Sequence, residues 1–208
     1  MLLLFPSFAL CLFSLIIILL TAVSVMAAII FTTGDIMFKK LVRLWVFLPA
    51  VVCAEVSIPE QIKPPSGNNP VLTVHAKGDQ IYQCSLNGGA YSWQLQAPDA
   101  RLYDAQGQIV GNHYSGPIWE YKEGSRVVGR VVSKIDIAPD SSISWLLVEV
   151  VAHKGNGLFS DVSFINRINT HGGLKPLSGC DSNHLGAEKR VPYTADYIFY
   201  EGLLASIP

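Results

Sequence analysis

The chain has 208 residues, a formal net charge of −1 and 50% hydrophobic residues. This length is ample for one domain, and the near-neutral charge argues against a nucleic-acid partner, which would need a basic stripe. The hydrophobic excess lies before Ala54, so the N-terminal part must be interpreted separately from the remainder.

Residues 1–36 form the first hydrophobic segment. Its apolar stretch, 2–31, is longer than the roughly 20 residues that cross a bilayer as a helix. Taken by itself, this segment predicts a transmembrane helix that contacts the membrane.

Residues 37–54 form a second hydrophobic segment with a different pattern. It begins with Met37, continues with a basic cluster and a short apolar run, and ends in the small-residue cleavage pattern of Val52 and Ala54. The basic cluster consists of Lys39, Lys40 and Arg43. This order is typical of a secretory signal peptide.

Two consecutive signals allow two interpretations. If translation starts at Met37, residues 1–36 are an over-extended start, and the mature protein is exported, either periplasmic or secreted. If translation starts at Met1 and residues 1–36 are retained, the protein is anchored in a membrane. We favour the first interpretation, because the second segment is a complete signal with its own methionine.

Residues 55–70 contain four prolines together with Ser-Gly and Asn-Asn pairs, which predicts an extended linker. Residues 71–208 are then expected to form the folded domain. Short strand-like runs alternate there with turn signals such as Asn87-Gly88-Gly89, and period-3.6 amphipathicity is not sustained. The run at 145–148 is apolar on both faces, as in a strand buried on both sides. This pattern predicts an all-β fold, an antiparallel β-sandwich or a barrel-like domain, with little helix.

Two cysteines, Cys84 and Cys180, lie in the expected exported domain. In an oxidising compartment an isolated pair is most simply a disulfide. The alternative is two buried free thiols. Whether a metal is bound stays open, because two cysteines alone do not make a zinc site.

Residues 104–130 contain five glycines, with aromatic residues between them. We expect a hairpin there whose turn displays His113, Tyr114 and Trp119, beside Glu120. His171 lies in a second glycine-rich stretch, with Arg167 before it as a fixed cation for an anionic group. The two stretches are predicted to meet and form the rim of a ligand-binding site.

Several motifs resemble, in order, a family of exported bacterial and fungal proteins known as a domain of unknown function (number 3455). They are QIYQC at 80–84, GNHYSGPIWE at 111–120, EGS at 123–125, SWLL at 144–147, NRINTHGG at 166–173 and VPYTADYIFY at 191–200. The resemblance implies a secreted, β-rich domain and assigns no activity.

We therefore expect an exported domain that binds an envelope or environmental ligand, a glycan or a lipid. The alternative is a secreted hydrolase or metal-dependent enzyme that uses His113, Glu120 and His171. No cofactor is expected, because the nearest approach to a dinucleotide fingerprint, at 155–160, lacks its third glycine and the following helix. A nucleophile-elbow motif, G-x-S-x-G, is likewise absent from the sequence. A purely structural role in the envelope is the third class.

Overall fold

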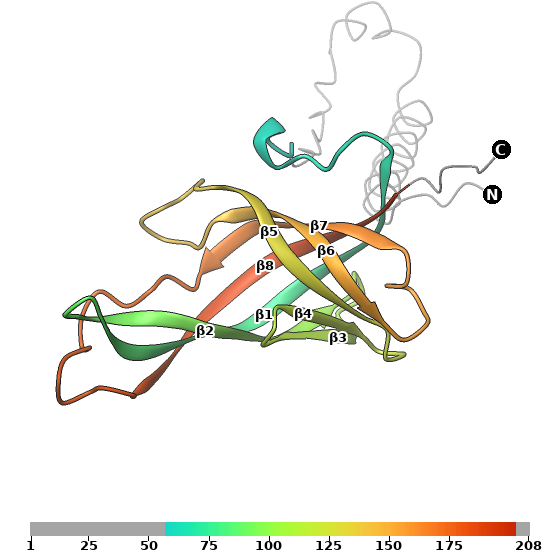
Figure 1. Ribbon diagram of the computed structural model, residues 1–208. Coiled ribbons are helices and arrows are strands. Elements are labelled where there is room, and N and C mark those ends of the chain that lie inside the picture. Colours follow the sequence, from blue (N-terminus) through green and yellow to red (C-terminus); the bar gives the residue numbers. More distant parts are fainter. Residues whose placement is uncertain (1–56, 203–208) are drawn as a thin grey trace, which may run out of the picture. The chain divides into compact units, whose positions relative to one another are not determined.

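The computed structural model describes residues 57–202, which form a closed barrel of eight antiparallel strands (Figure 1). The strands are β1 (Asn68–Asn87), β2 (Ala90–Tyr103), β3 (Ile109–Tyr114), β4 (Ile118–Tyr121), β5 (Arg126–Ile135), β6 (Trp145–Lys154), β7 (Val162–Gly172) and β8 (Glu188–Gly202). Each strand pairs with the next, and β8 pairs with β1 to close the barrel. The prediction of an antiparallel all-β domain is confirmed.

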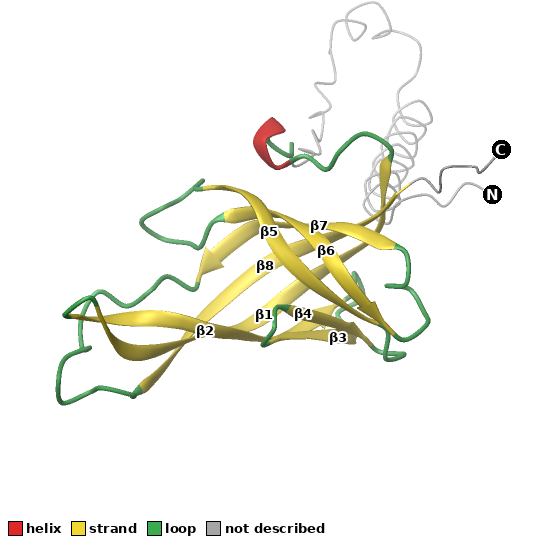
Figure 2. Cartoon of the chain, viewed as in Figure 1, coloured by secondary structure: helices red, strands yellow, loops and turns green. Residues whose placement is uncertain are grey.

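Helix is nearly absent from the described residues, as predicted. Figure 2 shows one short helical turn, the 3-10 helix η2 (Glu60–Ile62), before the strands begin. Within residues 57–202, no helix has the length and apolar character needed to cross a membrane. The expected transmembrane segment, 1–36, and signal peptide, 37–54, lie outside the described residues.

The strands form because large apolar or aromatic residues alternate with polar ones, which places one set inside the barrel. On β8 the buried set is Tyr193, Ala195, Tyr197 and Phe199, and the residues between them are less buried. Equivalent residues from the other strands complete one core cluster. The pairing of β8 with β1 closes the barrel, and the unpaired edges that remain are the parts of β2 and β5 that extend beyond β3 and β4.

The strands differ greatly in length, and this difference opens the wall of the barrel. β2 pairs with β3 only over Ala100–Tyr103, and β5 pairs with β4 only over Ile118–Glu120 against Arg126–Val128. The part of β2 before Ala100 and the part of β5 after Val128 therefore extend beyond the short β3–β4 hairpin. The barrel wall is therefore shorter at the β3–β4 hairpin than at β2 and β5 on either side of it.

The segment before β1 packs against the outside of the barrel. Ile62 is fully buried and contacts a second apolar cluster that includes Leu147 and Ile168. The side-chain amide of Asn166 donates to the carbonyl oxygen of Ile62 at 2.8 Å. From Ile58 onward, the predicted linker is thus part of the packed domain, and β1 begins at Asn68 rather than Val71.

This covering segment explains why residues 145–148 are apolar on both faces. Leu146 and Val148 belong to the cluster inside the barrel, whereas Trp145 and Leu147 belong to the cluster outside it. Both faces of this strand are therefore covered, fully at Leu147 and Val148 and partly at Trp145 and Leu146, as the sequence pattern predicts.

Truncation of Ile62 tests the contribution of the covering segment. We expect Ile62→Ala to lower the free energy of unfolding by about 3 kcal/mol, because it removes a fully buried side chain and leaves a cavity. The measurement is urea unfolding of the exported protein. The matched control is Ile109→Ala, at a side chain that is 54% exposed, for which the loss should stay below about 1 kcal/mol. Equal losses in the two variants would contradict this packing role.

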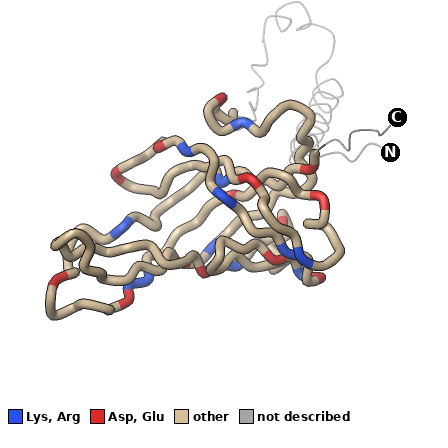
Figure 3. The backbone as a smooth tube through the Cα atoms, viewed as in Figure 1, with Lys and Arg blue, Asp and Glu red and all other residues tan. Residues whose placement is uncertain are grey.

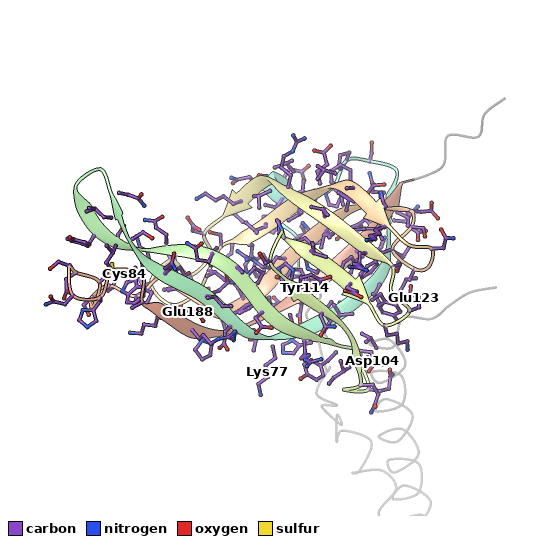
Figure 4. The ribbon with its side chains drawn as sticks, turned by 60° about the horizontal axis from the view of Figure 1, so that its bottom comes forward. Lys77, Cys84, Asp104, Tyr114, Glu123 and Glu188 are labelled. Atoms are coloured by element: carbon purple, nitrogen blue, oxygen red, sulfur yellow. A yellow bond between two sulfur atoms is a disulfide. The ribbon has the colours of Figure 1, made fainter. Side chains whose placement is uncertain are left out.

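A disulfide between Cys84 and Cys180 joins β1 to the long β7–β8 connection, with the Cα atoms 5.3 Å apart. The predicted pairing is confirmed, and no described cysteine is free. In Figure 4, Cys84 and Glu188 lie toward one end of the barrel and Asp104 and Glu123 toward the other. A structural disulfide of this kind indicates an oxidising compartment.

Charged residues of both signs are spread over the barrel. Figure 3 shows lysines and arginines interspersed with aspartates and glutamates along residues 57–202. Arg190, for example, forms ion pairs with Asp79, Asp99 and Glu188. One guanidinium is thus shared among three carboxylates.

Candidate functional site: an aromatic pocket in the barrel

A pocket of about 400 Å³ lies inside the barrel, at the low part of its wall. Its mouth is bounded by residues 95–98 of β2, by Val131 and Lys134 of β5, and by the β3–β4 turn at Gly116 and Pro117. Its interior is lined by Gln80, His113, Trp119, Leu146, Val148, Arg167 and Tyr197. All eight strands thus supply lining residues, so the fold itself builds the pocket.

Three rings form the aromatic wall of the pocket. His113 and Trp119 are directly paired across β3 and β4, and their rings stack with centroids 4.0 Å apart. The ring of Tyr197 meets both edge-on, at 5.3 Å from His113 and 5.6 Å from Trp119. Such stacked and edge-on arrangements suit aromatic quadrupoles and hold the rings in fixed positions.

Gly129 on β5 sets the position of the Trp119 ring. A Cβ at this residue would lie 2.8 Å from Cζ3 of Trp119 and 2.4 Å from Cγ1 of Val148. Both separations are too short for real atoms, so the indole occupies space that a side chain would otherwise fill. The absent side chain therefore lets the indole pack against β5 at this position.

His113 is a buried, neutral imidazole. It is 4% exposed, and burial lowers its pKa from 6.5 to about 3, although the hydrogen bond to a backbone carbonyl opposes this shift. The charge of Arg167 lowers the pKa further. Because Nδ1 lies 2.9 Å from the carbonyl oxygen of Ile118, the proton of the neutral ring belongs on Nδ1. Nε2 is then an acceptor.

Arg167 supplies a positive charge to the pocket. Its Nε and Nη2 donate to the carbonyl oxygen of Ser144, at 3.1 and 2.9 Å. It forms no ion pair with any carboxylate in residues 57–202. Its charge lowers the pKa of Tyr82, Tyr193 and Tyr197, against the larger effect of burial, which raises them.

Several buried polar atoms around the pocket have no hydrogen-bond partner. They are Nε1 of Trp119 and the hydroxyl group of Tyr197, both in the pocket lining, and the hydroxyl group of Tyr193, which does not line it. The two hydroxyl groups lie near each other, and that of Tyr197 also lies near Arg167. Gln80, which is 2% exposed, also lines the pocket. Buried polar groups are normally satisfied, so a cluster of unsatisfied ones beside a cavity indicates a place where another molecule can bind.

The structure brings together three of the predicted site residues, namely His113, Trp119 and Arg167. The other three lie elsewhere. Tyr114 and Glu120 pair with each other, hydroxyl to carboxylate at 2.6 Å, and neither lines the pocket. His171 is exposed near the end of β7 and contributes nothing to the pocket.

Two expectations about the histidines therefore need correction. His113 was expected in an accessible turn, but it lies in β3 and faces the interior, because strand alternation continues through this glycine-rich stretch. His171 also lies in a strand rather than a turn. Residues 169–173 add no residue to the rim of the pocket, which comes from β2, β5 and the β3–β4 turn.

The expected enzyme site of His113, Glu120 and His171 is not assembled. Glu120 pairs with Asn112 across the hairpin, one position away from the inward-facing His113–Trp119 pair, so it faces the opposite side of the sheet. In the part of the chain that the structure describes, no group of three histidine, cysteine or acidic side chains is placed to hold a metal.

Sequence reasoning missed Gln80, Leu146, Val148 and Tyr197 as pocket residues. The inward position of Tyr197 could have been predicted, because the alternation at 191–200 puts Tyr193 and Tyr197 on the same face of a strand. No sequence pattern predicts that residues 95–98 line the pocket, because this depends on how far β3 and β4 extend beside β2.

Comparison with curated proteins and with solved structures found no match. A family model, by contrast, matches residues 65–201, which include all eight strands except the last residue of β8. The matched range contains the pocket and both cysteines of the disulfide. The chain therefore belongs to the family described as protein of unknown function (DUF3455).

Proposed function

We propose that this domain is an exported binding protein that holds a small, largely apolar molecule inside its barrel. The observation that carries the proposal is the pocket of about 400 Å³, enclosed by aromatic and aliphatic side chains and open at one place in the wall. A concave, mostly apolar cavity with a few polar groups is the usual form of a small-molecule site. The disulfide and the signal-peptide pattern at 37–54 support export.

Of the two ligand classes expected from the sequence, the pocket favours a lipid-like molecule over a glycan. A sugar ring stacks on an exposed, flat aromatic face, but Trp119 is 3% exposed and already stacked on His113. The remaining surfaces, from Leu95, Val131, Leu146 and Val148, are aliphatic. Contact with apolar groups of a ligand removes these surfaces from water and lowers the free energy of binding, whereas contact with hydroxyl groups does so less.

The expected enzymatic alternative has no comparable support. His113 is buried and neutral with its Nδ1 bonded to a backbone carbonyl, and no carboxylate faces it as a partner within the pocket lining. A binding role needs no such partner.

The test is binding of the neutral fluorescent probe N-phenylnaphthylamine to the exported protein. We expect one saturable site in the wild type and at least about tenfold weaker binding in Val131→Trp, because a larger side chain at the mouth occupies the pocket. The matched control is Val132→Trp, since Val132 is similarly exposed but does not line the pocket. Absence of probe binding to the wild type, or an equal loss in both variants, would overturn the proposal.

A further inference from the structure

The pocket contains a positive charge that the protein itself does not neutralise. Arg167 faces the pocket from β7, and no described carboxylate forms an ion pair with it. Half-buried guanidinium groups are usually paired, because removal of the charge from water is otherwise costly. The backbone carbonyl of Ser144 accepts from Nε and Nη2, and the hydroxyl group of Tyr197 lies close to the guanidinium. Both partners are neutral, so the positive charge stays unbalanced.

Three other buried groups in or near the pocket are able to donate a hydrogen bond. An indole N–H can only donate, so Nε1 of Trp119 requires an acceptor. Burial raises the pKa of Tyr193 and Tyr197, so both hydroxyl groups stay protonated at neutral pH and are able to donate. The acceptors in the lining, Nε2 of His113 and the side-chain carbonyl of Gln80, are neutral, and no carboxylate lines the pocket.

From the unbalanced charge of Arg167 and the donors beside it we infer that the ligand is an amphipathic monocarboxylate, such as a medium-chain fatty acid. The inference rests on the proposed function. A carboxylate is purely an acceptor and carries the single negative charge that balances Arg167. Its apolar chain would then lie along Trp119, Leu146 and Val148 toward the mouth.

A single carboxylate fits better than a more highly charged group. Lys134 is the other cation in the lining, and it is exposed at the mouth rather than inside. A phosphate with two negative charges would bury an uncompensated charge beside one guanidinium. The hydrogen bonds of Arg167 to Ser144 also fix the guanidinium before binding, which lowers the entropic cost of using it.

The test compares decanoate with decanol as competitors that displace N-phenylnaphthylamine from the exported protein. The two ligands share a chain length and differ in charge. We expect decanoate to bind at least about tenfold more tightly than decanol, and this preference to fall as salt rises. Arg167→Gln should abolish the preference by weakening decanoate, with decanol changed less than about threefold.

Lys134→Gln is the matched control and should keep the preference for decanoate. Should Arg167→Gln fail to fold, the wild-type preference and its salt dependence decide the matter. Equal binding of decanol and decanoate, or loss of the preference in Lys134→Gln, would overturn the inference while leaving the proposed function intact. If the protein binds the neutral probe and neither decyl ligand, the inference alone fails. If it does not bind the probe, the proposed function fails with it.

Discussion

Removal of the Cys84–Cys180 disulfide is expected to lower the free energy of unfolding by about 4–5 kcal/mol. The two cysteines are separated by 96 positions, and a cross-link that closes so long a loop restricts the unfolded chain strongly. The measurement is urea unfolding of the Cys84→Ser, Cys180→Ser double variant of the exported protein. Its midpoint should fall well below that of the oxidised wild type.

Reduced wild-type protein is the control, because hydrogen bonds near the disulfide also hold the β7–β8 connection. The connection before β8 is also held by Trp93, whose indole N–H donates to the carbonyl oxygen of Ser178 at 2.9 Å, and by two backbone hydrogen bonds between Cys84 and residues 186 and 187. Both the reduced wild type and the double variant lack the cross-link and keep these hydrogen bonds, so we expect the two proteins to have similar free energies of unfolding. A loss below about 1 kcal/mol would show that these bonds hold the connection without the disulfide.

Acid is expected to destabilise the barrel through His113. The pKa of this histidine is about 3 in the folded protein and near 6.5 in the unfolded chain. Between these values the unfolded chain binds a proton that the folded protein does not. Stability therefore falls as the pH drops below 6.5, by about 1.4 kcal/mol per pH unit and roughly 5 kcal/mol over the whole window.

The measurement is the free energy of unfolding at several pH values between 7 and about 4. In His113→Phe the ring stack on Trp119 is retained and the titration is removed, so the variant should show a flatter dependence, although it loses the hydrogen bond to Ile118. His171→Gln is the control, since His171 is exposed and should leave the slope unchanged. Parallel curves for the wild type and His113→Phe would contradict a buried, neutral His113.

Much of the fold follows from local patterns in the sequence. The alternation at 191–200 and the turn at Asn87-Gly88-Gly89 predict strands and a hairpin, and both are present. The choice between a sandwich and a barrel could not be made in this way. It depends on long-range pairing of β1 with β8, whose residues are more than a hundred positions apart.

The site was predicted in part for a similar reason. Glycines at 111 and 116 suggested an exposed loop, but Gly111 pairs with Tyr121 inside a regular ladder. Its missing side chain allows close approach of the Glu120 carbonyl, which a Cβ would meet at 2.3 Å. A glycine in the sequence is compatible with either a turn or a close contact between strands. Only the pairing of the strands shows which of the two it serves.

The most direct test of a ligand site inside the barrel is the proton–nitrogen NMR spectrum of the tryptophan indole groups. The spectrum is recorded during titration with decanoate and, separately, with N-phenylnaphthylamine. The resonance of Trp119 is assigned with Trp119→Phe. Trp93, bonded to Ser178, and Trp145, packed on the outside of the barrel, serve as internal controls. We expect a saturable shift of the Trp119 indole with either ligand and little change at Trp93 and Trp145. Saturable binding that leaves Trp119 unmoved, or that shifts the three indoles alike, would place the ligand elsewhere and contradict this account.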